Sequence, residues 1–152
     1  MKIYHHKLVV ILITLAVMGA CATKAPMKEA TLFDRLGGKE AIQAVVSDFV
    51  DTVGGDKRIE NEKVAQRLKT IDINQLKALL VDQVCMGTGG PCEYKGRDMK
   101  VTHDGLGITD AEFDYVVDDL VQTLNKYKVP EKEQNELLAI LGPMRPDIVE
   151  VK

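Results

Sequence analysis

The sequence has no tryptophan, only 5% aromatic residues and three cysteines in 152 residues. So few aromatic side chains exclude a stacking platform for single-stranded nucleic acid. The acidic balance, with 23 Asp and Glu against 20 Lys and Arg and a pI of about 5.6, argues against a surface that binds nucleic-acid phosphates. Only one long apolar run occurs, which excludes a polytopic membrane protein. The length and the 45% hydrophobic content indicate one compact folded domain.

The N-terminus has the pattern of a signal peptide. Lys2 and Lys7 give a positively charged start, and residues 8–18 follow as an apolar run that only Thr14 interrupts. As a helix this run would rise about 17 Å, well short of the roughly 30 Å of hydrocarbon in a bilayer. We therefore predict that residues 1–20 are a signal peptide that is removed.

The residues Met18-Gly19-Ala20-Cys21 resemble the lipobox of bacterial lipoproteins, in which the cysteine is lipidated and becomes the new N-terminus. The resemblance predicts a lipid anchor on Cys21 and a lipidated tether over residues 21–30. No Asp follows Cys21, which favours the periplasmic side of the outer membrane by the sorting rule for such lipoproteins. Met18 departs from the usual Leu, so an ordinary cleaved signal peptide and an uncleaved anchor remain alternatives.

Two further cysteines, Cys85 and Cys92, are separated by six residues. An oxidising compartment outside the cytoplasm favours a disulfide between them. A structural metal site and two free thiols are the alternatives. Zinc needs about four ligands, and His103 would be the one histidine left beside this pair after residues 1–20 are removed, which weakens the metal alternative.

The spacing of apolar residues predicts helices throughout, and no segment alternates as a strand does. Asp72 with Gln75 and Thr109 with Glu112 suggest capping boxes, and Pro130 fits the first turn of a last helix. Residues 54–69 are expected to form a loop with a short helical turn. The sequence therefore predicts an all-α domain with four substantial helices, over residues 39–53, 72–84, 109–124 and 130–141, and a short helix around 98–103.

Little catalytic chemistry is available after residue 20. Ser47 is the only serine and lies on a predicted helix, and no glycine-rich loop is followed by the Lys-Ser/Thr that cradles phosphate. His103 is a single histidine, and such a residue is more often a packing residue than a ligand. Haem, however, needs only one protein ligand and apolar walls.

Three motifs, in order, resemble those of the group I truncated haemoglobins. The first runs from Thr31 to Gly38 and continues to Phe49, the second is Gly89 to Lys100, and the third is His103 to Thr109. The resemblance covers residues 31–150. It implies a truncated globin-like 2-on-2 helical sandwich around haem b, with His103 as the ligand of the iron. It also implies apolar contacts to haem from Phe49, Met99, Ile108, Phe113 and Val117, and contacts to the haem propionates from Tyr94, Arg97 and Lys100.

The expected distal pocket departs from the family. Val50 stands where many members have Tyr, and Leu76 and Leu80 stand where a polar side chain often meets the ligand. Gln83 is the one polar residue on that helix face, and it can either reach the ligand or lie at the edge of the pocket. Loss of hydrogen-bond donors is expected to weaken oxygen binding and to speed autoxidation.

The sequence therefore predicts a globin that reversibly binds oxygen, nitric oxide or carbon monoxide outside the cytoplasm. An alternative is a nitric oxide dioxygenase, which needs a redox partner to return the iron to its ferrous state. A second alternative is a cofactor-free helical lipoprotein that acts through protein contacts.

Overall fold

The computed structural model of the protein describes residues 29–151. The predicted signal peptide (1–20), Cys21 and most of the predicted tether therefore lie outside the described residues. The helices are α1 (Leu32–Arg35), α2 (Gly38–Gly55), α3 (Glu62–Thr70), α4 (Ile73–Gly87), α5 (Met99–His103), α6 (Asp110–Lys126), α7 (Glu131–Leu141), the 3₁₀ turn η1 (Gly142–Met144) and α8 (Arg145–Ile148).

The predicted all-α class is confirmed for this part of the chain. Within residues 29–151, β structure is limited to one isolated bridge between Thr109 and Val151. The four predicted long helices correspond to α2, α4, α6 and α7. No helix among these residues is long and apolar enough to cross a membrane.

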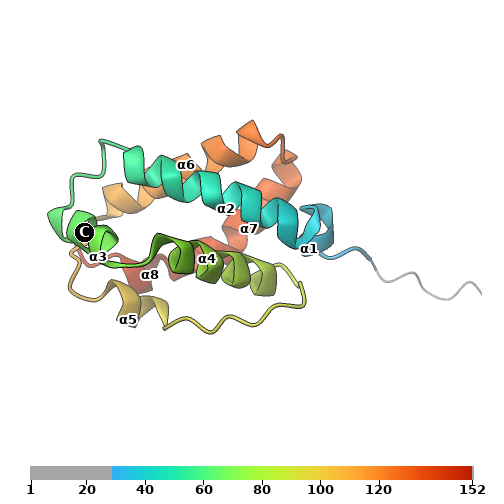
Figure 1. Cartoon of the computed structure of the whole chain (residues 1–152). Helices are drawn as coiled ribbons and strands as arrows, with labels where there is room; N and C mark the ends of the chain where they lie inside the picture. The colour runs from blue at the N-terminus through green and yellow to red at the C-terminus, as the bar shows by residue number, and fades with distance from the viewer. Residues whose placement is uncertain (1–28, 152) are drawn as a thin grey trace, which may run out of the picture.

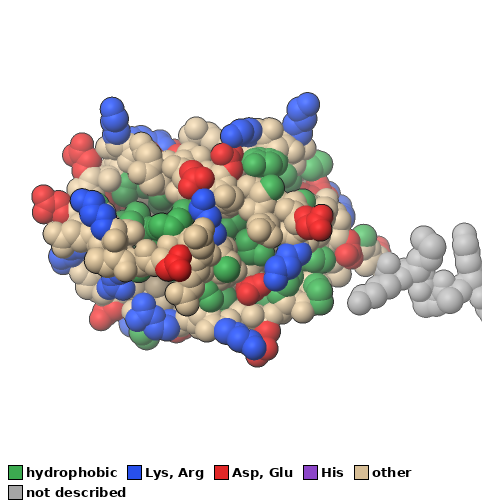
Figure 2. All heavy atoms as spheres, in the orientation of Figure 1, with side chains coloured by type: hydrophobic (Ala, Val, Ile, Leu, Met, Phe, Trp, Pro, Cys, Tyr) green, Lys and Arg blue, Asp and Glu red, His purple; other side chains and the backbone are tan. Residues whose placement is uncertain are grey.

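The long helices lie in two layers, with α2 and α4 in one and α6 and α7 in the other. Helix α2 packs against both α4 and α6, α1 contacts α2 and α7, and the short α5 packs against α8. Figure 1 shows α2 and α4 one above the other, with α6 and α7 behind α2. On the face in Figure 2, acidic and basic side chains are interspersed and apolar side chains lie between them, with no patch of one charge.

Two small apolar clusters form the core. Leu32, Leu124 and Leu137 join α1, α6 and α7, and Ile42, Val46 and Val81 join α2 and α4. Leu124 is only 1% exposed. Full burial of one such side chain contributes about 1.5–3 kcal/mol, so these contacts stabilise the packing of α1 on α6 and α7 and of α2 on α4.

Side-chain caps begin several helices. Thr109 accepts from the N–H of Glu112, and the Glu112 carboxylate accepts from the N–H of Thr109, so the predicted capping box is confirmed. Asp72 caps α4 by accepting from the N–H groups of Asn74 and Gln75. Pro130 is the N-cap of α7 and precedes its first turn, which differs from the prediction by one position.

Residues 54–69 are more helical than the prediction of a loop with a short turn. Helix α3 has nine residues, and the side chain of Asn61 caps it by accepting from the N–H groups of Lys63 and Val64. No residue of α3 is buried, because Val64 and Leu68 are its only large apolar side chains. A helix with so little apolar surface leaves a weak periodic signal in the sequence.

The predicted Cys85–Cys92 disulfide is present, and it excludes the alternative of two free thiols in this structure. It joins the end of α4 to the loop that leads to α5, and Cys85 is 0% exposed. A Cβ at Gly90 would lie 2.5 Å from the ring of Phe33 and 2.7 Å from the sulfur of Cys85, so glycine is required there. Among the described residues no group of three or more His, Cys, Asp or Glu could hold a metal ion.

Candidate functional site

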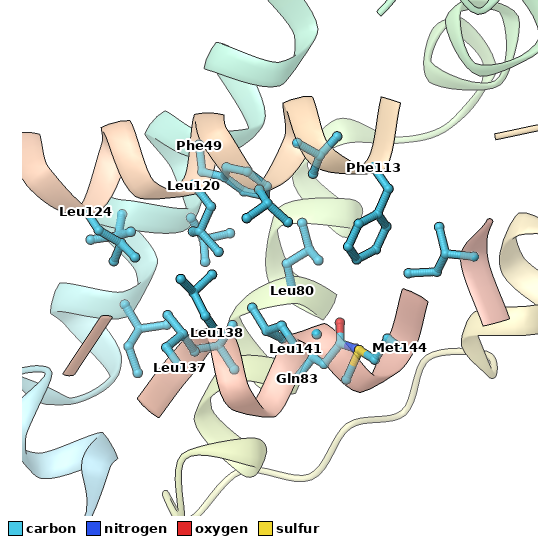
Figure 3. Close-up of a pocket in the computed structure, with 18 of the residues that line it drawn as sticks. Phe49, Leu80, Gln83, Phe113, Leu120, Leu124, Leu137, Leu138, Leu141 and Met144 are labelled. Atoms are coloured by element: carbon cyan, nitrogen blue, oxygen red, sulfur yellow. The ribbon is translucent and has the colours of Figure 1, made fainter. Parts of the chain in front are cut away.

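A cavity of about 420 Å³ lies between the two layers. Its walls are aliphatic and aromatic side chains from α2, α4, α6 and α7, and Figure 3 shows them converging on one space. Apart from backbone groups, the polar side chains in the wall are those of Gln83, His103 and Arg145. A concave, mostly apolar site with a few polar groups is typical of a site for a small ligand or cofactor.

His103 is the last residue of α5, the short helix at one side of this cavity. Asp98 begins α5 by accepting from the N–H groups of Lys100 and Val101. The ring Nδ1 of His103 lies 2.7 Å from the carbonyl oxygen of Met99. Because a carbonyl oxygen only accepts, this contact assigns the proton to Nδ1 and leaves the lone pair on Nε2. A histidine fixed in this way is suited to bind a metal through Nε2.

Gln83 extends from α4 into the cavity beside two thioethers. Its Nε2 lies 3.4 Å from Sδ of Met144 and 3.6 Å from Sδ of Met99, and Figure 3 shows the amide next to Met144. Thioether sulfur is a weak acceptor, so these contacts leave the amide able to exchange partners. Gln83 therefore lines the cavity, but its amide contacts methionine sulfur there.

Arg145 closes the cavity wall at the start of α8. Its guanidinium lies 4.4 Å from the centre of the Phe113 ring, and it forms ion pairs with Asp110 at 2.8 Å and with Asp114. The two carboxylates raise the pKa of Arg145 above its ordinary value. The guanidinium lies over the ring of Phe113, where a cation–π contact adds to the ion pairs.

Seven of the residues that were predicted to surround a cofactor do line the cavity. They are Phe49, Leu80, Gln83, Met99, His103, Phe113 and Val117. They come from α2, α4, α5 and α6, which are far apart in the sequence, and the fold brings them together.

The other predicted site residues lie outside the cavity wall. Val50 packs against the Ile42, Val46 and Val81 cluster, and Leu76 is half-buried on α4. The other four are Ile108, Tyr94, Arg97 and Lys100. The carbonyl oxygen of Ile108 accepts from the N–H groups of residues 150 and 151, and the hydroxyl of Tyr94 donates to the carbonyl oxygen of Arg97. Arg97 and Lys100 are exposed.

Sequence reasoning missed part of the wall. Val116, Leu120 and Leu124 recur every four residues in the predicted helix 109–124, but nothing in this spacing distinguishes cavity lining from solid core. Arg145 and Met144 gave no signal, because their partners Phe113 and Gln83 lie on other helices.

Residues 31–150 match the bacterial-like globin family. The chain is 34% identical over 119 residues to a group 1 truncated hemoglobin of Mycolicibacterium paratuberculosis, covering 78% of this chain and 84% of that protein. It is 29% identical over 122 residues to a group 1 truncated hemoglobin of Tetrahymena pyriformis, covering 80% of this chain and 97% of that protein.

Solved structures agree with the sequence comparison. The Fe(III) form of the truncated hemoglobin from Tetrahymena pyriformis superposes with a TM-score of 0.71 at 28% identity, over 79% of this chain and 98% of that one. The cyanomet 2/2 hemoglobin of a Synechococcus species, which carries covalently attached heme, gives 0.69 at the same identity and coverage. The predicted 2-on-2 helical sandwich is thereby confirmed.

Proposed function

Because the chain belongs to the bacterial-like globin family, we propose that His103 ligates the iron of haem b in this cavity and that a diatomic gas binds reversibly at the iron. Haem with its iron is the cofactor of the truncated globins, and gas binding is their common property. What we propose for this chain is the residue that ligates the iron, the preferred gas and the cellular location.

The geometry of His103 is the observation that carries the proposal. Its Nδ1 is engaged by the carbonyl oxygen of Met99, and it is the one described histidine in the wall of a large apolar cavity. His103 would hold the iron of haem, and the iron would supply the position at which a gas binds. The apolar side chains from α2, α6 and α7 would surround the macrocycle and keep water away from it.

The distal side favours ligands that need no hydrogen-bond donor. Leu80 presents only an alkyl group to the cavity, Val50 and Leu76 add no donor, and the amide of Gln83 contacts thioether sulfur. Bound oxygen carries partial negative charge and depends on a nearby donor, whereas carbon monoxide depends on one much less. Nitric oxide and carbon monoxide are therefore favoured over oxygen.

The propionates of the haem are assigned to the exposed loop and helix that precede His103. Arg97 and Lys100 are exposed cations there, and the hydroxyl of Tyr94 donates to the carbonyl oxygen of Arg97, which fixes the loop. Cations at the rim of the site pair with carboxylates without a large desolvation cost.

The protein acts outside the cytoplasm, anchored to the outer membrane by a lipid on Cys21. The lipobox resemblance of residues 18–21 suggests the anchor, and the Cys85–Cys92 disulfide is typical of an oxidising compartment. Labelling of cells with a radioactive fatty acid tests this part. Label is expected on the wild type and not on Cys21→Ser. An unlabelled wild type would refute the proposed lipid anchor.

Absorption spectra test the haem site. The purified protein supplied with haemin is expected to bind one equivalent and to show a Soret band that moves on reduction with dithionite and again with carbon monoxide. In His103→Ala these shifts are expected to be lost. The same spectra with and without His103 would refute ligation by this residue.

A further inference from the structure

The turn that follows His103 is held by a carboxylate from the other end of the domain. Gly105 and Gly107 adopt positive φ values of 76° and 68°, in the left-handed region that favours glycine. Their N–H groups both donate to Glu150, Gly105 to Oε1 at 2.7 Å and Gly107 to Oε2. Two backbone N–H groups that converge in this way form an anion site, and here the anion is a side chain of the protein itself.

The opposite side of the turn is held by α3 and its cap. The ammonium of Lys63 donates to the carbonyl oxygen of Gly105 at 3.0 Å, and the amide of Asn61 donates to the carbonyl oxygen of Leu106 at 3.2 Å. The N–H of Leu106 in turn donates to the carbonyl oxygen of His103 at 3.1 Å. Side chains of Glu150, Lys63 and Asn61 therefore hold the backbone of the turn by hydrogen bonds. The turn is also hydrogen-bonded to His103 through the N–H of Leu106.

Glu150 is itself held in place. The N–H groups of Glu150 and Val151 donate to the carbonyl oxygen of Ile108 at 2.8 and 3.1 Å, and the N–H of Asp110 donates to the carbonyl oxygen of Val151 at 3.2 Å. Helix α8, which precedes Glu150, packs against α5. Figure 1 shows this C-terminal end beside α3, on the side of the molecule where α5 ends.

Glu150 is ionised at neutral pH. The two glycine N–H groups lower the pKa of Glu150, and the cations of Lys63 and Lys100 lower it further. Hydrogen bonds to a charged group are stronger than hydrogen bonds between neutral groups. The hydrogen bonds from the two glycine N–H groups therefore depend on the charge of Glu150 as well as on its shape.

We propose that Glu150 is a positioning residue for His103: its carboxylate fixes the turn 104–107, and this turn sets the depth and orientation of the imidazole in the cavity. The inference rests on the proposed function, because Glu150 would affect haem binding only through the bond between His103 and iron. A weaker grip allows the end of α5 to shift, which spreads the orientations of the ring and changes the strength of that bond. Loss of a residue that orients a metal ligand alters the affinity of the metal site by about 10- to 100-fold.

Glu150→Gln and Glu150→Ala test the proposal, with Asp147→Ala as the control. Gln keeps the shape of Glu but places an amide N–H₂ against a glycine N–H and removes the charge. Asp147 is an exposed carboxylate on α8, three residues from Glu150. Far-ultraviolet circular dichroism establishes that each variant keeps its helices, and Glu150→Gln serves if Glu150→Ala does not fold.

The first readout is amide hydrogen exchange of Gly105 and Gly107 in the protein without haem. Both Glu150 variants are expected to speed this exchange roughly 10- to 100-fold, as expected for the loss of a charge-assisted hydrogen bond, and Asp147→Ala is expected to leave it unchanged. Unchanged exchange in the Glu150 variants would overturn the proposal at its first step.

The second readout is the iron–histidine stretching band in the resonance Raman spectrum of the ferrous protein. The band is expected to shift or broaden in both Glu150 variants and to stay in place in Asp147→Ala. Faster exchange with an unmoved band would leave Glu150 a purely structural role and overturn the proposal. A wild type whose ferrous haem is five-coordinate but gives no such band would refute ligation by His103 itself, and with it the inference.

Discussion

The Nδ1 of His103 lies 2.7 Å from the carbonyl oxygen of Met99, the residue four positions earlier in α5. The two groups belong to the same helix, so a five-residue segment by itself fixes the tautomer of the ring. Nε2 remains the nitrogen with a free lone pair. A single helical turn therefore orients the proposed ligand, and the remaining helices supply the apolar cavity beside it.

Removal of the imidazole from this helix is expected to be reversible with free imidazole. His103→Gly leaves space at the end of α5, so millimolar imidazole is expected to restore the Soret shift with carbon monoxide that the variant lacks. Spectral titration measures the restoration. Val101→Ala, at a side chain on α5 that is 59% exposed, is the matched control and is expected to behave as the wild type. Full haem binding by His103→Gly without imidazole would point to another ligand.

Leu80→Gln is expected to slow the dissociation of oxygen. Leu80 lines the cavity from α4, and a new amide there can donate to the ligand. A hydrogen bond worth about 1.4 kcal/mol corresponds to about a tenfold slower dissociation, while carbon monoxide is expected to change much less. Stopped-flow measurement of both rates tests this.

The matched control for Leu80→Gln is Ala78→Gln, on the exposed part of α4, which is expected to leave both rates unchanged. Val50→Tyr tests the neighbouring position on α2 in the same way. An oxygen dissociation rate in the wild type that is already as slow as in Leu80→Gln would indicate that Gln83 leaves Met99 and Met144 and meets the ligand.

Reduction of the Cys85–Cys92 disulfide is expected to lower the free energy of unfolding by about 2.5 kcal/mol, because the bond restricts a short loop in the unfolded chain. Urea unfolding with and without a reductant measures this difference. The double variant Cys85→Ala, Cys92→Ala controls for other effects of the reductant and is expected to show none. Equal stability of the oxidised and reduced wild type would contradict the prediction.

The buried carboxyl of Asp119 gives stability a specific dependence on pH. Asp119 is 3% exposed, its Oδ1 accepts from Arg58 at 3.2 Å, and its Oδ2 has no hydrogen-bond partner among the described residues. Burial raises the pKa of Asp119, the nearby charges of Asp56 and Asp118 raise it further, and Arg58 opposes them. The folded protein therefore binds a proton at pH values where the unfolded chain has lost it. The resulting stability is complete below about pH 4 and is lost as the pH rises through the folded pKa.

Asp119→Asn is expected to remove this dependence while keeping an acceptor for Arg58. Its free energy of unfolding minus that of the wild type is expected to increase from pH 4 to pH 7. Asp56→Asn is the control of opposite sign, because hydrogen bonds from Arg58 lower the pKa of Asp56, and the stability from that group is lost as the pH falls. Chemical denaturation from about pH 4 to pH 7 measures the effect of Asp119, and denaturation from about pH 5 down to pH 2 measures that of Asp56. A constant difference for Asp119→Asn would contradict the prediction.

Local signals in the sequence predicted the helices well where neighbours in the chain supply the capping atoms. Thr109 and Glu112 are three residues apart and close their box without help from the rest of the fold. Helix α1 has the same kind of box, between Thr31 and Asp34, which are also three residues apart in the sequence. Helix α3 was underestimated because its polar surface leaves no apolar stripe, although Asn61 marks its start.

By itself, the sequence determined the helical class, because the spacing of apolar residues is a local signal. The expected oxidising compartment favoured the Cys85–Cys92 pair, and the resemblance of the ordered motifs to a family implied His103 as the candidate ligand. Only the tertiary structure decided which apolar residues line a cavity, that Gln83 contacts two thioethers and that Arg145 covers Phe113. It also decided that Glu150 grips the turn after His103. The contacts of Gln83, Arg145 and Glu150 join residues up to 61 positions apart, and the cavity joins residues still further apart. These contacts depend on how the helices pack, which periodicity along one chain does not specify.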